Sequence, residues 1–238
     1  MIQFYSPDIE KSQVLPESDS QHAIRMLRMG MGDELEIVDG KGHRFRTRIL
    51  DPHPKRTLVE IIERIDSPLA WSYDITVAVA PTKNMDRMEW LVEKLTEIGV
   101  NRIVPVRCQR SERREIKKER LEKIAISAMK QSLKSVLPHV DEMTDIKNFI
   151  NDVRHTPGQK FMGYCSDEVE RRLMARACQP HTDTIILIGP EGDFTPQEVA
   201  EAIGAGFVAV TMGDNRLRTE TAALVGCDTV HIINQSNG

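Results

Sequence analysis

The chain has 238 residues, of which 40% are hydrophobic, enough for one large domain or two smaller ones. Its 32 Lys and Arg against 36 Asp and Glu give a net charge of −4, so any nucleic-acid surface depends on how the cations are distributed. Since no long apolar run, basic-apolar leader or paired-cysteine motif is present, we expect a cytoplasmic protein without a membrane span, secretory signal, metal site or disulfide framework.

Short strands and turns occupy the N-terminal part of the chain. Apolar or alternating runs at 34–38, 43–50 and 57–62 are separated by turn-forming Gly, Pro and Asp residues. This pattern predicts a small β-barrel-like domain over residues 1–70. A linker is expected at 67–72, where Ser and Pro precede a new pattern.

One of these predicted strands carries three arginines. Residues 43–50 alternate strictly, and strand side chains alternate between the two faces of a sheet. The arginines that therefore share one face are Arg44, Arg46 and Arg48. They form either a platform for an RNA backbone or a solvated face paired with glutamates of the neighbouring strands.

Strands and helices alternate over residues 73–238. Apolar runs predict strands, and apolar residues at helical spacing predict helices. The main expected strands are 75–80, 103–106, 160–164, 184–188 and 207–211, and the main expected helices are 88–98 and 121–134. This alternation predicts an α/β domain with a mostly parallel sheet and helices on both faces.

A basic segment lies between the second of these strands and the following helix. Residues 101–120 contain eight Lys or Arg against three Glu. Such a segment is either a solvated face or a phosphate-binding surface whose RNA affinity depends on salt.

The first of two C-terminal motifs runs from Ile188 to Pro196. Gly189 and Gly192 permit turns and close approaches that other residues resist. Thr195 is the expected N-cap of the next helix, with Glu198 completing a capping box. Taken alone, the motif is compatible with an ordinary tight turn between a strand and a helix.

The second motif runs from Met212 to Ala222 and also joins a strand to a helix. Arg218, Thr219 and Glu220 place a cation, a hydroxyl and a carboxylate side by side at the helix start. An alternative is that Thr219 caps the helix, Glu220 favours its dipole and Arg218 is solvated. Two such loops can form one pocket of backbone amides and carbonyls for a small polar cofactor.

Together the motifs resemble those of the ribosomal small subunit RNA methyltransferase E family, a SPOUT-class family that methylates N3 of a uracil in 16S rRNA. The usual first motif reads Gly-Pro-Glu-Gly-Gly-Phe, and the second reads Leu-Gly followed by Ile-Leu-Arg-Thr-Glu-Thr-Ala. Three positions depart from this pattern. Asp193 replaces the second paired glycine and changes the charge of the loop, Met212 replaces the leucine, and Arg216 replaces the isoleucine.

The resemblance implies a fold and partners for both domains. Residues 73–238 would form a SPOUT domain with a trefoil knot, an S-adenosylmethionine pocket and a homodimer with each active site near the interface. Residues 1–70 would form a PUA-like RNA-binding domain. Its candidate RNA contacts are His22, Arg25 and Arg28, although the two arginines could simply lie on an exposed helix face.

The resemblance also implies roles for the motif residues. The candidate cofactor contacts are Leu187, Gly189, Pro190, Glu191, Gly192, Met212, Gly213, Leu217 and Thr219, with the two leucines on either side of the adenine. Arg218 would stabilise charge on the uracil or hold a phosphate. Glu220 and Glu191 are candidate bases, or else they bind backbone amides. No metal is needed for this transfer.

The remaining candidate RNA contacts follow the first two strands of the second domain. They are Lys83, Arg110, Ser111, Arg113 and Arg114, and a structural salt bridge is the alternative for the Arg-Ser pair. The implied activity is methylation of uridine N3 in 16S rRNA within the small subunit. Alternatives are methylation of another structured RNA and RNA binding without catalysis. A nucleotide-dependent enzyme is disfavoured because neither G-x-G-x-x-G after the first strand nor G-x-x-x-x-G-K-[ST] occurs.

Overall fold

The computed structural model describes residues 2–166 and 168–236. The chain divides into two compact units. The first contains the residues up to Trp71 together with Ile126–Leu137, and the second contains Ser72–Ala125 and the residues from Pro138 onward. None of the helices among the described residues is long and apolar enough to cross a membrane.

The first unit is built on a four-stranded sheet in the order β1-β2-β3-β4. Its elements are β1 (Gln3–Tyr5), α1 (Ile9–Ser12), α2 (Glu17–Gln21), a π-helical turn (His22–Met26), β2 (Glu34–Val38), β3 (His43–Asp51) and β4 (Leu58–Asp66). β1 runs parallel to β2, whereas β2, β3 and β4 are antiparallel. A bridge from Val14 to Leu58 adds the segment after α1 to the other edge of the sheet. N-terminal residues thus pair with both edges of this sheet.

The core of the first unit lies on the apolar face of β3. Phe45 and Ile49 are fully buried together with Ile37 of β2 and Phe4 of β1. The predicted alternation along β3 is therefore confirmed, because the residues between them turn to the other face.

The second unit contains an eight-stranded sheet in which every strand pair is parallel. The strands are β5 (Ile75–Val79), β6 (Arg102–Arg107), β7 (His139–Val140), β8 (Thr144–Asp145), β9 (Gln159–Gly163), β10 (Arg172–Leu173), β11 (Thr184–Ile188) and β12 (Val208–Thr211). The helices are α3 (Met85–Ile98), α4 (Lys118–Gln131), α5 (Ile146–Val153), α6 (Met174–Ala177), α7 (Pro196–Gly204) and α8 (Thr219–Ser236). The strand order is β10-β12-β9-β11-β5-β6-β7, with β8 paired to β6. The predicted parallel sheet is confirmed.

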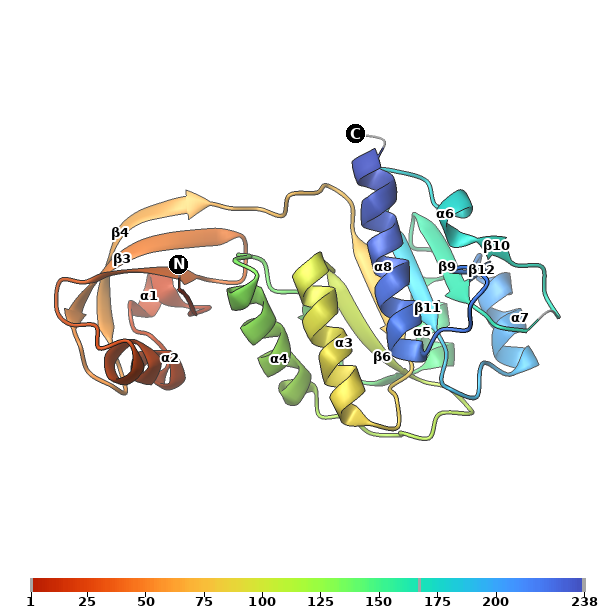
Figure 1. Cartoon of the computed structure of the whole chain (residues 1–238), viewed down its shortest axis with the longest axis horizontal. Coiled ribbons are helices and arrows are strands. Elements are labelled where there is room, and N and C mark those ends of the chain that lie inside the picture. Colours follow the sequence, from red (N-terminus) through yellow and green to blue (C-terminus); the bar gives the residue numbers. More distant parts are fainter. Residues whose placement is uncertain (1, 167, 237–238) are drawn as a thin grey trace. The chain divides into compact units, whose positions relative to one another are not determined.

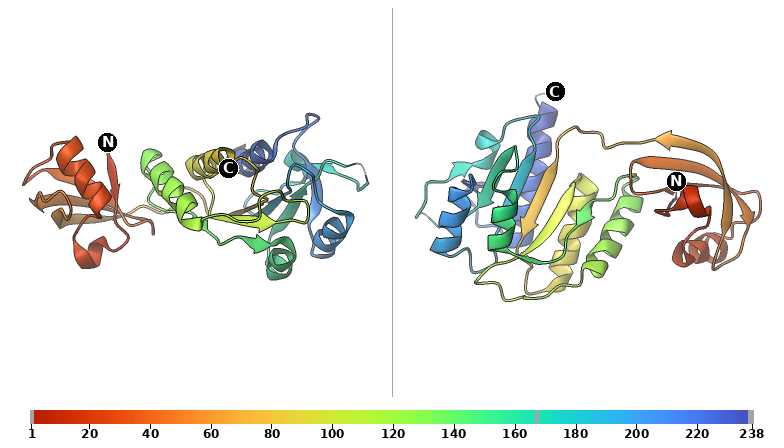
Figure 2. Two further views of the ribbon diagram at one scale, coloured as in Figure 1. Left: turned by 90° about the horizontal axis from the view of Figure 1, so that it is seen from below. Right: turned by 180° about the vertical axis from the view of Figure 1, so that it is seen from behind.

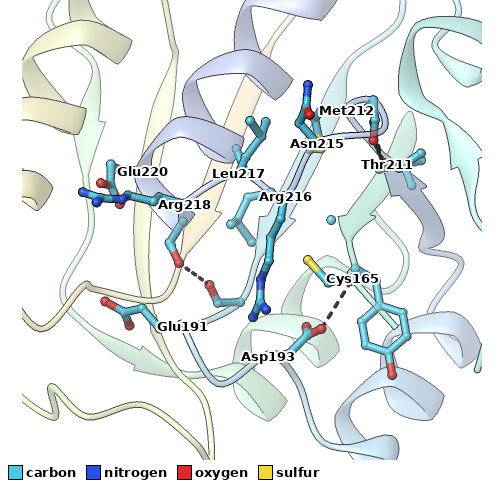
Figure 3. Close-up of a pocket in the computed structure, with 18 of the residues that line it drawn as sticks. Cys165, Glu191, Asp193, Thr211, Met212, Asn215, Arg216, Leu217, Arg218 and Glu220 are labelled. Atoms are coloured by element: carbon cyan, nitrogen blue, oxygen red, sulfur yellow. Dashed lines mark hydrogen bonds between the residues drawn. The ribbon is translucent and has the colours of Figure 1, made fainter. Parts of the chain in front are cut away.

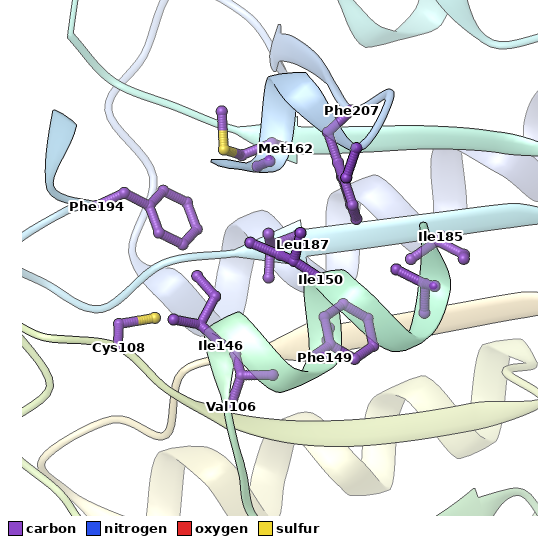
Figure 4. Packing of buried hydrophobic residues seen from close by; sticks show 14 of the residues in the cluster. Val106, Cys108, Ile146, Phe149, Ile150, Met162, Ile185, Leu187, Phe194 and Phe207 are labelled. Carbon is purple, nitrogen blue, oxygen red and sulfur yellow. The ribbon is translucent and has the colours of Figure 1, made fainter. Parts of the chain in front are cut away.

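Helices cover both faces of this sheet (Figures 1 and 2). On β11, Ile185 and Leu187 pack into a cluster with Phe149 of α5 and residues of α7 (Figure 4). Ile186 points the other way, toward Gly226 of α8. Because β11 is buried on both faces, its continuous apolar sequence is explained.

The start of α7 follows the predicted pattern. The Thr195 hydroxyl accepts a hydrogen bond from the Glu198 amide, and the Glu198 carboxylate accepts one from the Thr195 amide. Pro196 occupies the first turn. The capping box that the sequence predicted is therefore confirmed, and it fixes where the first motif loop ends.

The last helix does not stay beside the strand that precedes it. β12 lies between β10 and β9, whereas α8, which follows β12, packs against α3, β11 and β5. The chain between Met212 and Arg218 therefore carries the polypeptide from one part of the sheet to another across the carboxyl ends of the strands.

Candidate active site

A cavity of about 760 Å³ lies where three neighbouring strands end (Figure 3). Its walls come from the segments that follow β9, β11 and β12. These strands are adjacent in the sheet, with β9 between the other two. Since ligands of parallel sheets bind outside the carboxyl ends of the strands, this is the position expected for a ligand site, and its volume suits a small molecule.

The two motif loops meet at this cavity. The Thr219 hydroxyl donates a hydrogen bond of 3.2 Å to the Gly189 carbonyl oxygen. Thr219 is the first residue of α8 and is buried. Its hydroxyl thus joins the second loop to the first, rather than accepting from an amide of its own helix as the capping alternative required.

At two positions of the loops, backbone geometry or close packing explains why the residue is glycine. A Cβ atom on Gly189 would lie 3.0 Å from the Phe194 ring. Gly213 has a φ angle of +142°, which side chains rarely tolerate. Both glycines line the cavity, so the backbone itself forms part of its wall.

Arg110 supports the first loop. Its guanidinium donates hydrogen bonds to the carbonyl oxygens of Gly192, at 3.0 Å, and Phe194, at 3.2 Å. Ser111 is buried and accepts a hydrogen bond of 3.0 Å from the Cys108 amide. The Arg-Ser pair therefore has a structural role, through hydrogen bonds rather than a salt bridge, and Gly192 packs on Arg110 instead of lining the cavity.

Carboxylates and cations line one side of the cavity. The Glu220 side chain is 8% exposed and lies 3.8 Å from the Arg87 guanidinium. Glu191 accepts a hydrogen bond of 3.3 Å from the Lys83 amide. Binding to a backbone amide was the alternative to a role as catalytic base for this residue. The Arg218 guanidinium makes no hydrogen bond or ion pair with any residue in 2–166 or 168–236. Arg218 thus lines the same cavity as these two acidic side chains without a partner among the described residues.

Leu187, a predicted cofactor contact, is not among the residues that line the cavity. Its side chain is fully buried in the cluster formed with α5 and α7 and does not reach the cavity. The neighbouring residue of the strand, Ile188, lines the cavity together with Leu217. In a strand buried on both faces, the apolar sequence does not reveal which residues face which side.

The segment after β9 contributes residues that the motifs did not reveal. Tyr164, Cys165 and Arg171 line the cavity, and the Arg171 guanidinium donates to the carbonyl oxygens of Tyr164, at 3.3 Å, and Cys165, at 3.1 Å. Arg87, at the start of α3, was also missed. The predicted strand at 160–164 was a usable signal, because its carboxyl end had to lie at this edge of the sheet.

Asp193 takes an unusual backbone conformation in the first loop. Its φ angle is +61°, in the left-handed region that favours glycine. Its carboxylate accepts hydrogen bonds from the Phe194 amide, at 2.9 Å, and from the Cys165 amide, at 3.3 Å. The left-handed geometry explains why glycine is usual at this position, and the carboxylate ties the loop to the end of β9.

Cys165 is exposed, whereas the other three cysteines are buried. Partial burial raises the pKa of the Cys165 thiol, and the charge of Asp193 raises it further. Arg216 and Arg171 act in the opposite direction and lower that pKa. The thiol therefore lies within electrostatic reach of both signs of charge.

The arginines of β3 are paired with glutamates, as the alternative interpretation proposed. Arg44 lies 3.7 Å from Glu36, Arg46 lies 3.3 Å from Glu63 and 3.6 Å from Glu34, and Arg48 lies 3.0 Å from Glu60 and 3.4 Å from Glu34. These exposed pairs compensate the three like charges of this face.

The candidate contacts at the N-terminal turn lie in a less regular segment than a helix face. His22 packs against Phe4 with ring centroids 5.8 Å apart. Arg25 and Arg28 are both exposed, but Arg25 belongs to the π-helical turn and Arg28 has a φ angle of +58°. The two arginines therefore do not share a regular helix face.

Many cations of the basic segment are also engaged. Lys83 lies 2.9 Å from Glu112, and Arg113 donates to the carbonyl oxygens of Thr82 and Lys83. Within 2–166 and 168–236, three exposed cations of this region make neither an ion pair nor a side-chain hydrogen bond. They are Arg114, Lys117 and Lys123.

No group of three or more His, Cys, Asp or Glu side chains in the described part of the chain is arranged to hold a metal ion. The polar groups of the cavity are instead backbone amides, carboxylates and guanidinium groups. For example, the amides of Asn215, Arg216 and Leu217 donate to no described residue. They are open to a ligand.

Two known families match most of the chain. Residues 15–62 match the family described as RNA methyltransferase PUA domain, and residues 70–231 match the family described as RNA methyltransferase domain. The ribosomal RNA small subunit methyltransferase E of Mesomycoplasma hyopneumoniae is 30% identical over 176 residues, covering 72% of this chain and 75% of that protein.

Solved structures share the fold over the whole chain. The crystal structure of a probable rRNA-methyltransferase from Porphyromonas gingivalis has 43% sequence identity and a TM-score of 0.93, covering 100% of both chains. A ribosomal RNA small subunit methyltransferase E from Neisseria gonorrhoeae, bound to S-adenosyl methionine, has 28% identity and a TM-score of 0.83, covering 98% of both chains.

Proposed function

The chain belongs to the ribosomal RNA small subunit methyltransferase E family, and we propose that it transfers a methyl group from S-adenosylmethionine to N3 of a uridine in 16S rRNA. The observation that carries this proposal is the hydrogen bond from Thr219 to Gly189. It joins the two motif loops around one cavity at the carboxyl ends of parallel strands.

The cavity has the chemistry needed for the cofactor. Ile188, Met212 and Leu217 give it an apolar wall that suits an adenine ring. The open amides of the second loop can donate to the ring nitrogens, and Gly189 and Gly213 let the backbone approach closely. S-adenosylmethionine supplies a methyl group already activated by its sulfonium, so the protein mainly has to align the reactants and exclude water.

The substrate uracil needs help because N3 carries a proton at neutral pH. Arg218 has no protein partner among the described residues, so its guanidinium can donate to a uracil carbonyl oxygen and stabilise the negative charge that develops as the proton leaves. Glu220 and Glu191 both line the cavity and are the candidate proton acceptors. Glu191 has one oxygen engaged by the Lys83 amide and the other remains to accept the proton.

RNA recognition is assigned to exposed cations in both units. Arg25 and Arg28 of the first unit are exposed, and so are the unpaired Arg114, Lys117 and Lys123. Their contacts with phosphates would make affinity fall as salt rises. The substrate that we propose, 16S rRNA in the small ribosomal subunit, is in the cytoplasm.

We also propose that the second unit is a trefoil knot and that the protein is a homodimer. The path of α8 supports the knot, because the helix returns from β12 to pack against β11, β5 and α3. Analytical ultracentrifugation of the full chain tests the dimer, and a monomeric protein that retains methyl transfer would contradict it.

The decisive experiment is methyl transfer from labelled S-adenosylmethionine to purified small ribosomal subunits that lack the modification. We expect one new N3-methyluridine, identified by nucleoside mass spectrometry. Arg218→Ala should abolish transfer while largely sparing cofactor binding, and Arg218→Lys is the matched variant that keeps the charge. Methylation of a different RNA would show that 16S rRNA is not the substrate. RNA binding without cofactor binding would indicate a non-catalytic protein.

A further inference from the structure

Two charged residues of the cavity stand where the related motifs usually carry uncharged ones. Asp193 lies in the first motif loop and Arg216 in the second, and both line the cavity. In Figure 3 the Arg216 side chain extends from its own loop toward Asp193. The two form no ion pair with each other, so opposite charges face one cavity without neutralising each other by direct contact.

The Asp193 carboxylate is held in place by two hydrogen bonds but can accept more. One oxygen accepts from the Phe194 amide and the other from the Cys165 amide. An ionised carboxylate has about four acceptor sites, so about two remain. Its φ angle of +61° holds this side chain at a turn position that glycine would fill without strain.

The Arg216 guanidinium is unengaged by comparison. No residue in the ranges 2–166 and 168–236 makes a hydrogen bond or ion pair with it. The nearby guanidinium of Arg171, in contrast, is engaged by the carbonyl oxygens of Tyr164 and Cys165. Arg216 therefore keeps the five donors of its guanidinium for a ligand, in a planar arrangement suited to a carboxylate.

We propose that Asp193 and Arg216 form a subsite for the zwitterionic amino acid end of the cofactor. The Asp193 carboxylate accepts hydrogen bonds from the ligand's α-ammonium group, and the Arg216 guanidinium donates to the ligand's α-carboxylate. This inference rests on the proposed function, because it assigns one end of S-adenosylmethionine within the same cavity. It makes the two residues determinants of cofactor affinity rather than participants in proton transfer.

Three ligands separate the two contacts in a binding experiment. S-adenosylmethionine carries both charged groups, decarboxylated S-adenosylmethionine keeps only the ammonium, and methylthioadenosine has neither. Affinities of the full chain for each are measured by titration calorimetry. Arg216→Gln should lower the affinity for S-adenosylmethionine by about ten- to a hundredfold, the range for a lost hydrogen bond to a charged group. The affinity for decarboxylated S-adenosylmethionine should not change.

Asp193→Asn is the matched variant for the other contact. Asparagine tolerates the left-handed conformation and its amide oxygen can still accept from one loop amide, but the negative charge is lost. We expect weaker binding of both ammonium-bearing ligands and unchanged binding of methylthioadenosine. Thermal melting of each variant without ligand checks that the loop remains folded.

Several outcomes would overturn the subsite. Equal losses for all three ligands would mean that the substitutions only disturb the loops, and no loss for any would mean that neither residue binds the cofactor. Retained cofactor affinity with weaker rRNA binding in Arg216→Gln would assign that residue to RNA. If the unsubstituted chain binds S-adenosylmethionine and the variants behave in one of these ways, only the subsite fails. If the unsubstituted chain binds none of the ligands, the proposed function fails with it.

Discussion

The hydrogen bond between the two motif loops can be removed without changing the shape of the side chain that makes it. Thr219 is 7% exposed, and its hydroxyl donates to the Gly189 carbonyl oxygen at 3.2 Å. Thr219→Val replaces the hydroxyl by a methyl group of similar size. Taking the donor from a buried acceptor costs about 1–3 kcal/mol, so the variant should be destabilised by that amount.

The same substitution should also weaken binding of S-adenosylmethionine. The loops that it releases both line the cavity, and a loss of about 1.4 kcal/mol corresponds to a tenfold change in affinity. Urea unfolding measures the stability and titration calorimetry the affinity. Thr219→Ser keeps the hydroxyl and is the control, which should bind like the unsubstituted chain.

A result in which Thr219→Val matches the unsubstituted chain in both stability and affinity would refute this reasoning. The two loops would then be held together by their backbone paths alone. A loss of stability with unchanged affinity would instead separate the packing of α8 from the shape of the cavity.

Two further predictions concern single side chains of the second unit. Alkylation of Cys165 should reach its half-maximal rate above the ordinary thiol range, because burial and Asp193 raise its pKa. In profiles of alkylation rate against pH, Asp193→Asn should lower the midpoint and Arg216→Gln should raise it. Shifts of both variants in the same direction would contradict these opposite effects of the two charges on the thiol. Tyr73→Phe removes the hydroxyl that lies 2.9 Å from Nδ1 of buried His231, and should destabilise the protein by about 1–3 kcal/mol in urea unfolding; an unchanged midpoint would show that the bond contributes nothing.

Local chemistry made some elements predictable from the sequence. The capping box of Thr195 and Glu198 needs only residues within one turn, and the structure contains it. The helix expected to end at residue 98 likewise ends there, with Gly99 as its C-cap. Features of this kind depend on neighbours in the chain, so no information about the rest of the fold was required.

Pairing between distant segments was not predictable in the same way. The charge pattern of β3 permitted an RNA-binding face, and only the positions of β2 and β4 reveal that glutamates lie beside all three arginines. The π-helical turn at His22–Met26 also has no signal in a pattern that fits a regular helix. In both cases the decisive contacts come from residues far apart in the sequence or from backbone geometry.

The order of the strands explains why the two motifs form one site. Gly163, at the end of β9, is paired with Ile188 of β11 on one side and with Val210 of β12 on the other. A Cβ atom on Gly163 would lie 2.7 Å from the end of the Ile188 side chain and 3.4 Å from that of Met212, so the glycine leaves room for side chains of both motifs over the end of β9. Neither motif contains Gly163. The site is therefore encoded partly in a strand whose sequence, read alone, marks it only as part of the core.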